Sequence, residues 1–266
     1  MKNTIRIIAA LLIVFAMGLA LICCSNNESA DTKADAETTA AADTTEETKE
    51  ETEEQTEEAT ETEAEIGMPY ACVTVYDGAK VVAAEVKVEK VDEDEDGKWT
   101  INDALITLHK DKCADGFATV TSDYGPMITK LWAVENGGAY GYYKNNRMSM
   151  GLTEELSETE PDHVYAYVYS DATGYSDAYS FFDKNAVSGK EGDKVTLSVK
   201  YIAGFDENYV PIESPLADAV ITIDGNATEF KTDENGSVEI TLPASGTVIS
   251  AAKEGLTLIP PVCVIE

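Results

Sequence analysis

Residues 163–169 read His163-Val164-Tyr165-Ala166-Tyr167-Val168-Tyr169. Successive side chains of a β-strand point to opposite faces, so the three tyrosines share one face and the three small aliphatic residues share the other. The aliphatic face predicts packing against a core. The tyrosine face has two interpretations, an aromatic surface that is exposed or a face that packs under a helix. This strand therefore predicts a sheet with one buried side.

Further segments of the same kind extend outward from this strand. Alternating or β-rich segments predict strands at Tyr70–Tyr76, Lys80–Val91, Phe117–Thr121, Met127–Val134, Tyr140–Tyr143 and His163–Ser170. One helix is predicted from Asn102 to about Lys112, because Ala104, Leu105 and Leu108 recur at helical spacing. We therefore expect residues 67–185 to form an α+β module, an antiparallel sheet with one main helix.

The C-terminal part, residues 186–266, predicts strands only. Short alternating segments lie at Lys194–Tyr201, Ala219–Ile223, Ser237–Leu242 and Thr247–Ala252. The dipeptides Asp224-Gly225 and Asn235-Gly236 separate some of them and are typical of hairpin turns. This pattern predicts an all-β sandwich, either immunoglobulin-like or transthyretin-like.

Aromatic residues give the first candidate binding site. If the tyrosine face is exposed, it joins other tyrosines that lie close to it in the sequence. The candidate ligand-binding residues are Tyr140, Tyr142, Tyr143, Tyr165, Tyr167 and Tyr169. Aromatic rings with a polar hydroxyl suit a small ligand such as a corrinoid or a glycan.

The α+β module resembles the transcobalamin-like C-terminal domain of cobalamin carriers and bacterial surface proteins. The matching segments are Thr100–Leu105, Tyr124-Gly125 with Ile128–Leu131, Gly141–Asn146, and Gly151-Leu152 leading to Pro161–Val164. The resemblance does not extend to the helical barrel that binds most of the corrinoid in those carriers. It implies a module that faces a ligand or a partner, with cobalamin as one candidate.

Residues 92–103 match the pattern of an EF-hand calcium loop. Such loops place oxygen ligands at fixed positions, with a glycine at the sixth. The candidate ligands are Asp92, Asp94, Asp96, Lys98 through its carbonyl, Thr100 and Asp103, with Gly97 at the turn. The loop resembles the calcium loops of dockerins, and we expect a structural calcium ion. The alternative is a solvated turn in which Thr100 caps the helix and Asp103 is its acidic capping partner.

The N-terminus predicts a lipid anchor. A short basic start precedes an apolar run over residues 7–22, and we interpret residues 1–23 as a lipoprotein signal peptide. Leu21-Ile22-Cys23-Cys24 resembles a bacterial lipobox, with Cys24 as the acylated residue and Cys23 as a second candidate. A cleaved secretory signal is an alternative, as is a membrane span, which needs about 20 apolar residues.

Residues 24–66 are expected to form a disordered acidic stalk after the lipidated cysteine. From residue 28 to residue 66 they are almost entirely Glu, Thr, Ala and Asp, and such a composition cannot bury a core. A stalk of this kind lifts a folded domain away from the membrane. A tract that collects cations is the alternative interpretation.

Charge and motifs argue against several function classes. The formal net charge of -31 excludes nucleic acid as an expected partner. Catalysis is not expected, because His109 and His163 are the two histidines and Ser250-Ala-Ala-Lys253 lacks the partner motifs of penicillin-binding enzymes. The isolated cysteines Cys72, Cys113 and Cys263 do not have zinc-ligand spacing. These cysteines have two alternative interpretations, a Cys72–Cys113 disulfide or buried thiols.

Together these patterns predict a lipoprotein on the extracellular face of a bacterial membrane. We expect it to be a non-catalytic binding module for a small ligand, with structural calcium and no catalytic cofactor. The alternative is a structural or adhesive surface protein that contacts other proteins.

Overall fold

The computed structural model describes residues 69–208 and 210–266, which belong to one compact unit. The predicted signal peptide, the lipidated Cys24 and the acidic stalk lie outside the described residues. Within the described part the fold is mostly β-sheet, with α1 as its one helix. This helix has 12 residues, and no helix of the described part is long and apolar enough to cross a membrane.

The first lobe, which runs from β1 to β7, is built on a five-stranded sheet. Its order is β2 (Lys80–Glu89), β1 (Tyr70–Asp77), β7 (Asp162–Val168), β5 (Tyr140–Lys144) and β6 (Arg147–Met148). The expectation of a wholly antiparallel sheet is wrong, because β1 and β7 run parallel. The long connection between them, which contains α1, allows β7 to return in the same direction as β1.

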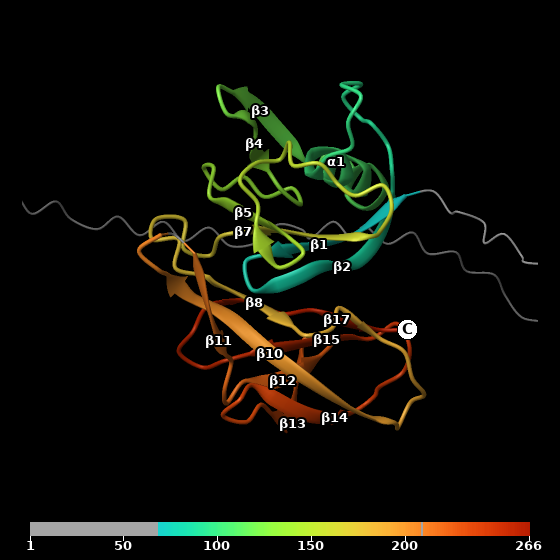
Figure 1. The fold of residues 1–266 in the computed structure, drawn as a ribbon, viewed down its shortest axis with the longest axis vertical. Helices are drawn as coiled ribbons and strands as arrows, with labels where there is room; N and C mark the ends of the chain where they lie inside the picture. Colours follow the sequence, from blue (N-terminus) through green and yellow to red (C-terminus); the bar gives the residue numbers. More distant parts are fainter. Residues whose placement is uncertain (1–68, 209) are drawn as a thin grey trace, which may run out of the picture. The chain divides into compact units, whose positions relative to one another are not determined.

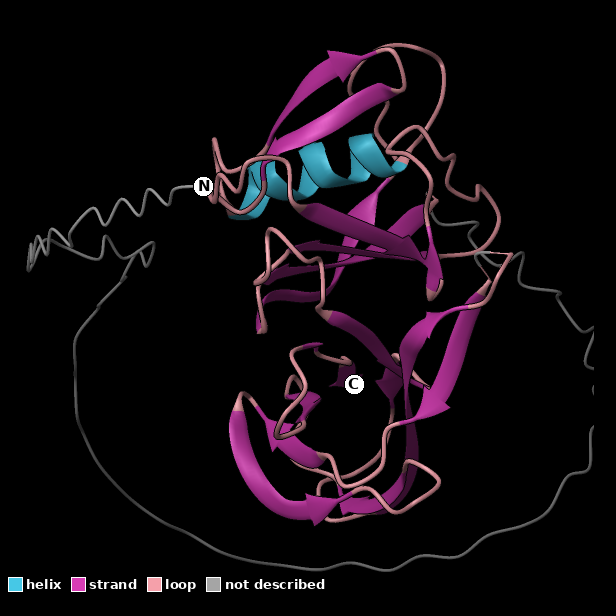
Figure 2. Cartoon of the chain, turned by 90° about the vertical axis from the view of Figure 1, so that its left-hand side faces the viewer, coloured by secondary structure: helices cyan, strands magenta, loops and turns pink. Residues whose placement is uncertain are grey.

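Helix α1 (Ile101–Lys112) covers one face of this sheet, as Figures 1 and 2 show. Thr100 caps the helix, and its side chain and that of Asp103 form a capping box. Leu105 and Leu108 are buried in a core with the aliphatic residues of β1 and β7. The hairpin of β3 (Ala118–Ser122) and β4 (Gly125–Lys130) contributes Ile128 to that core.

The second lobe, which runs from β8 to β17, contains two sheets around a second core. One sheet joins β11 (Pro211–Pro215), β10 (Lys194–Phe205), β8 (Ala178–Phe182) and β16 (Leu258–Ile259), with β14 (Ser237–Thr241) also paired to β10. The other has the order β13 (Asn226–Lys231), β12 (Val220–Ile223), β15 (Val248–Ala252), β17 (Cys263–Ile265) and β9 (Ala186–Val187). Both sheets contribute residues to one core, whereas the immunoglobulin-like or transthyretin-like sandwich stays a prediction.

Two details of the second lobe differ from expectation. β8 pairs with β10 and β16, so the second lobe begins before residue 186. The turn at Asp224-Gly225 closes the β12–β13 hairpin, but that at Asn235-Gly236 connects strands of different sheets. Gly236 is required there, because its φ is +74° and a Cβ would lie 2.3 Å from the carbonyl oxygen of Val199.

A third core joins the two lobes. It lies on the face of the first sheet that points away from α1, and Figure 1 shows β8 and β17 on that side. Its buried members are Tyr76, Tyr143, Tyr165, Tyr167, Tyr179, Ile202, Ile259 and Val262. Both faces of the first sheet are therefore covered.

Candidate functional site

The six candidate ligand tyrosines do not form one surface. Tyr140 and Tyr142 on β5 pack against the core on the helix side, whereas Tyr143 on the same strand points to the opposite side. The Tyr140 hydroxyl accepts a hydrogen bond from Asn136 N–H at 2.7 Å and lies 2.8 Å from the Thr129 carbonyl oxygen, to which it donates. Tyr140 thus holds the segment around Asn136 in place on the helix side.

Of the two interpretations of the tyrosine face, exposure is wrong for three of the six candidate ligand tyrosines. Tyr143, Tyr165 and Tyr167 are only 3%, 3% and 1% exposed. The alternative, that this face packs under the helix, is also wrong, because these rings contact the second lobe. Alternation places side chains on a face of the sheet but does not show which distant part of the chain covers that face.

The tyrosine rings form a continuous series from the interior to the surface. Tyr143 stacks on Tyr179 with ring centres 3.7 Å apart and planes at 7°. Tyr143 also contacts Tyr167, which meets Tyr169 edge to face, and Tyr169 meets Tyr175 in the same way. Burial raises the pKa of the Tyr143 and Tyr167 hydroxyls, so both are neutral phenols at physiological pH.

The outer end of this series lines a cavity of about 260 Å³, which we call the aromatic cavity. Its residues come from both lobes: Tyr143, Met148, Tyr167, Tyr169, Tyr175–Tyr179, Tyr201–Phe205 and Leu256. Tyr175 and Phe205 are 55% and 44% exposed, which leaves ring surface accessible at the cavity. Three of the predicted ligand tyrosines, Tyr143, Tyr167 and Tyr169, therefore line a cavity, although two of them expose little surface.

Hydrogen bonds fix the loop that carries Tyr175. The buried carboxylate of Asp177 accepts hydrogen bonds from the backbone N–H groups of Ser170 at 2.6 Å and Asp171 at 3.1 Å. The Asp171 carboxylate accepts one from Gly174 N–H at 2.8 Å and one from the Ser176 hydroxyl. These bonds hold the pKa of Asp171 well below its usual range, first through the Gly174 N–H. The ring of Tyr175 is thus presented by an ordered loop.

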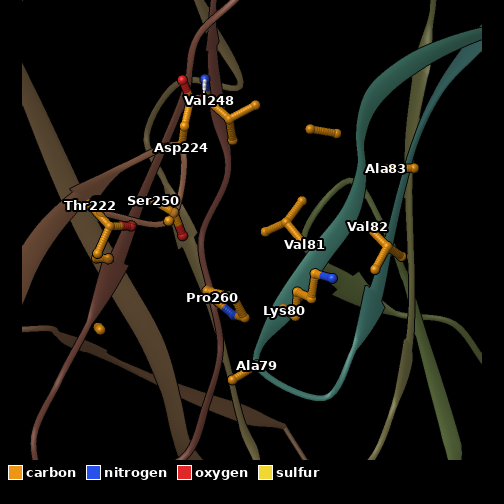
Figure 3. A pocket seen from close by; sticks show the side chains of 14 residues that line it. Ala79, Lys80, Val81, Val82, Ala83, Thr222, Asp224, Val248, Ser250 and Pro260 are labelled. Atoms are coloured by element: carbon orange, nitrogen blue, oxygen red, sulfur yellow. Dashed lines mark hydrogen bonds between the residues drawn. The ribbon is translucent and has the colours of Figure 1, made fainter. Parts of the chain in front are cut away.

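A second hollow of about 560 Å³ lies between β2 and the outer side of β12 and β15. Figure 3 shows Lys80 and Val81 on one side of it, with Thr222 and Ser250 on the other. Its walls are mainly alanine, valine and other small residues, and no aromatic ring lines it. It is larger than the aromatic cavity, and its polar side chains are Lys80, Thr222, Asp224 and Ser250.

The structure brings three of the predicted calcium ligands together. One carboxylate oxygen from each of Asp92, Asp94 and Asp96 lies within 4.8 Å of the others. Asp92 accepts hydrogen bonds from the N–H groups of Asp96 at 3.1 Å and Gly97 at 2.8 Å. The pKa of Asp94 is raised, through partial desolvation and then through the negative charges of Asp103 and Asp96.

The last predicted ligand, Asp103, has another role. Its carboxylate accepts hydrogen bonds from Thr100 N–H at 2.8 Å, the Thr100 hydroxyl at 2.6 Å and Glu93 N–H at 2.9 Å. Asp103 and the Thr100 side chain therefore form the helix cap, which the alternative interpretation predicted. Calcium itself stays a prediction, with Lys98 available only through its carbonyl.

His109 and Lys253, which the sequence offered only as weak catalytic candidates, each contact a backbone carbonyl oxygen. His109 is buried, its Nδ1 lies 2.6 Å from the Leu105 carbonyl oxygen, and its Nε2 accepts a hydrogen bond from Trp132 N–H. Burial lowers the pKa of His109, so the ring is neutral. Lys253 donates to the Ala217 carbonyl oxygen at 2.5 Å, not to Ser250.

Sequence reasoning missed a cluster formed by Cys72, Glu85 and His163. Their ligand atoms lie within 4.8 Å of one another, although Glu85 and His163 are 78 residues apart. Cys72 is a free thiol, so the Cys72–Cys113 disulfide is not formed; the Cys72 side chain points away from α1, which Cys113 follows. Burial, and then the charge of Glu85, raises the pKa of Cys72 to about 11. No spacing in the sequence signals this cluster.

Compared with the models of known protein families and with curated protein sequences, the chain matches none. The resemblance to the transcobalamin-like domain therefore stays a prediction.

Proposed function

We propose that this chain is a non-catalytic binding protein that takes a ring-shaped small ligand, such as one sugar of a glycan, in the aromatic cavity. The observation that carries the proposal is the exposed ring surface of Tyr175 and Phe205 beside a cavity of about 260 Å³. Binding sites commonly combine aromatic walls with a few polar groups that fix orientation. The predicted lipid anchor and stalk would place this site outside the cell.

The size of the cavity favours a single ring over a corrinoid. Pockets that enclose drug-sized ligands have volumes of about 300–1,000 Å³, and the aromatic cavity lies just below that range. A sugar ring presents C–H groups to an aromatic face and hydroxyls to polar atoms, and tyrosine offers both kinds of contact. The hydroxyl of Tyr169, which accepts a hydrogen bond from the buried Tyr167 hydroxyl at 3.0 Å, keeps its own proton to donate and supplies the polar side.

A titration of the full chain with soluble oligosaccharides of N-acetylglucosamine or galactose, followed by calorimetry, tests this proposal. Tyr175→Ala should weaken binding by about ten-fold or more, since exposed aromatic anchors contribute above 1 kcal/mol. The matched control is Tyr124→Ala, because Tyr124 is 93% exposed and does not line the cavity. Equal weakening in both variants, or no binding to any sugar, contradicts the proposal.

The larger hollow beside β2 requires its own control. Ala252 lines that hollow, and Ala252→Leu should narrow it without touching the aromatic cavity. Sugar binding should remain unchanged in this variant. A loss of binding in Ala252→Leu with full binding in Tyr175→Ala would assign the ligand to the hollow instead.

We also propose structural calcium at Asp92, Asp94 and Asp96. A dication would relieve the mutual repulsion of three carboxylates beside the helix cap. Calcium should raise the melting temperature of the full chain, and Asp94→Asn should abolish that rise while leaving the calcium-free melting temperature nearly unchanged. Glu207→Gln serves as the matched control, since this residue is exposed and remote in sequence from the loop. An equal calcium response in both variants would contradict the proposal.

An adhesive role is the second candidate function. The β3–β4 hairpin exposes apolar side chains, with Tyr124 at 93% and Val120 at 53%, and Met150 is 93% exposed. Apolar side chains that gather into one exposed patch mark surfaces that contact other proteins. If adhesion to cells depends on this hairpin, Tyr124→Ala should reduce it and Tyr175→Ala should not.

A further inference from the structure

The structure contains a group of metal-binding side chains that the sugar-binding proposal does not use. Cys72 lies on β1, Glu85 on β2 and His163 on β7, three strands that are neighbours in the first sheet. Cys72 and His163 are directly opposite each other in the parallel β1–β7 register. A thiol, a carboxylate and an imidazole are thus brought to one face of one sheet.

A β-bulge directs Glu85 toward this face. Between the pairs Val73–Val86 and Val75–Ala83, one residue of β1 faces two residues of β2. Glu85 is one of the two, and its φ is +45°, a conformation uncommon for a residue with a side chain. Bulges often re-aim a side chain next to a functional site, and residues in sparsely populated conformations cluster at such sites.

Thr74 holds the Glu85 carboxylate in place. The Thr74 hydroxyl accepts a hydrogen bond from Glu85 N–H at 2.9 Å and donates to Glu85 Oε1 at 3.1 Å. Glu85 Oε2 is 2.6 Å from His163 Nδ1. A second residue that fixes the orientation of a carboxylate is typical of metal sites.

The position of the group suits an ion that comes from solvent. The Glu85 side chain is only 3% exposed, which excludes most competing water, whereas that of His163 is 28% exposed and gives access from outside. The negative net charge of the chain raises the local concentration of cations. The site is thus accessible on one side and enclosed on the other.

We propose that Cys72, Glu85 and His163 bind one zinc ion. Zinc takes sulfur, nitrogen and oxygen ligands at about 2.0–2.3 Å, so ligand atoms around one ion are roughly 3–4 Å apart. The three atoms here already lie within 4.8 Å of one another, so small side-chain rotations bring them to the ion. Calcium and magnesium are excluded as the preferred ions, because a thiolate is a poor ligand for hard cations.

The three ligands leave a fourth tetrahedral position open. In zinc sites with three protein ligands, that position holds water or an outside ligand. The contact between Glu85 and His163 is replaced by bonds to the ion, and the Cys72 thiol releases its proton on binding. Zinc therefore ties three neighbouring strands together on the side of the sheet that faces the second lobe.

Cobalt(II), which replaces zinc and has visible and near-ultraviolet absorption, tests the proposal. The full chain in reducing buffer, with millimolar calcium to occupy carboxylate sites, should bind one equivalent and show a sulfur-to-cobalt charge-transfer band. Zinc should displace the cobalt and remove the band. Cys72→Ser should abolish the band. Cys263→Ser is the matched control, since Cys263 is also a free thiol but lies outside the group.

Two further variants separate zinc ligation from a purely structural role. His163→Gln should weaken zinc binding by more than about 100-fold, and Thr74→Val, which alters only the positioning residue, by about 10- to 100-fold. Circular dichroism without metal checks that each variant folds; if Cys72→Ser does not fold, the zinc affinity of His163→Gln decides. A band that persists in Cys72→Ser, no band in the unsubstituted chain, or full zinc affinity in His163→Gln overturns the proposal.

Discussion

The two faces of the first sheet are formed by the same strands, but they need different contacts from the part of the chain that covers them. On the helix side, β1 and β7 present valine and alanine, which pack against the leucines of α1. On the other side the same strands present tyrosines, Cys72 and His163, which need hydrogen bonds and matched ring contacts. An aliphatic face accepts any apolar cover, whereas an aromatic and polar face needs a specific one. The aromatic cavity and the group of Cys72, Glu85 and His163 both lie on the tyrosine side.

Truncation of one buried side chain on each face of the first sheet should have the largest effect on stability. Tyr179→Ala and Leu105→Ala should each lower the free energy of unfolding by about 3–5 kcal/mol, because both side chains are fully buried. Only Tyr179→Ala should uncouple the lobes, since Tyr179 belongs to the core that joins them. Urea unfolding followed by tryptophan fluorescence reports the first lobe alone, through Trp99 and Trp132, whereas circular dichroism reports both lobes.

In the unsubstituted chain and in Leu105→Ala the two signals should change together. In Tyr179→Ala the two midpoints should separate. Coincident transitions in Tyr179→Ala would show that the tyrosine side does not couple the lobes.

The close approach of Tyr167 to Gly141 gives a smaller effect. A Cβ on Gly141 would lie 2.2 Å from the Tyr167 ring, so Gly141→Ala should cost about 1–3 kcal/mol. Gly151→Ala is the control, since its Cβ would meet nothing closer than 3.6 Å. In a Tyr167→Leu background the cost of Gly141→Ala should fall, and thermal unfolding of the four variants measures that coupling. An unchanged cost would place the strain elsewhere.

Removal of one tyrosine hydroxyl on each face of the first sheet should have a smaller effect on stability. Tyr140→Phe removes the acceptor of Asn136 N–H on the helix side, and Tyr179→Phe removes a donor to the Asn146 side chain at 2.8 Å on the other. Each should lower the free energy of unfolding by about 1 kcal/mol. Only Tyr179→Phe should alter the aromatic cavity, which chemical shifts of its lining residues can detect. Equal shift changes in both variants would contradict this assignment.

The smallest effect at neutral pH is a pH dependence that arises on the helix side. Burial lowers the pKa of His109 in the folded chain, whereas its unfolded value is about 6.5. Below about pH 6.5 the unfolded chain binds a proton that the folded chain does not, so the free energy of unfolding falls as the pH falls, until the folded pKa is passed. His109→Gln should lose this part of the slope in urea titrations between pH 7 and pH 5. An identical slope in the variant would assign the dependence to other groups.

The sequence predicted the helix and the strands better than it predicted which distant segments pair or pack together. The strands around residues 163–169 and the helix from Asn102 are present, because periodicity and capping are local properties. The parallel β1–β7 pairing and the cover of the tyrosine side were not predictable, since both depend on which distant segments pair.

In the candidate sites, too, features set by neighbouring residues could be predicted and features set by distant segments could not. Asp92, Asp94 and Asp96 lie within five residues of the chain, so the sequence alone places them close together, whereas calcium stays a prediction and the position of Asp103 in the cap was only the alternative. The group of Cys72, Glu85 and His163 depends on a bulge and on the register of three strands, neither of which a linear spacing encodes.

The parallel pairing of β1 and β7 also sets how the protein withstands tension. The chain enters the first lobe at Tyr70 and leaves it after Val168, so a pull between what precedes β1 and the second lobe acts in opposite directions on two parallel neighbours. Their ladder runs from Ala71–Asp162 to Asp77–Val168, and a pull along the strands loads all of its hydrogen bonds in shear at once. In an antiparallel pair at that place, the same pull would load the hydrogen bonds one after another, starting at one end. The parallel pairing therefore gives the first lobe mechanical resistance without any additional contact.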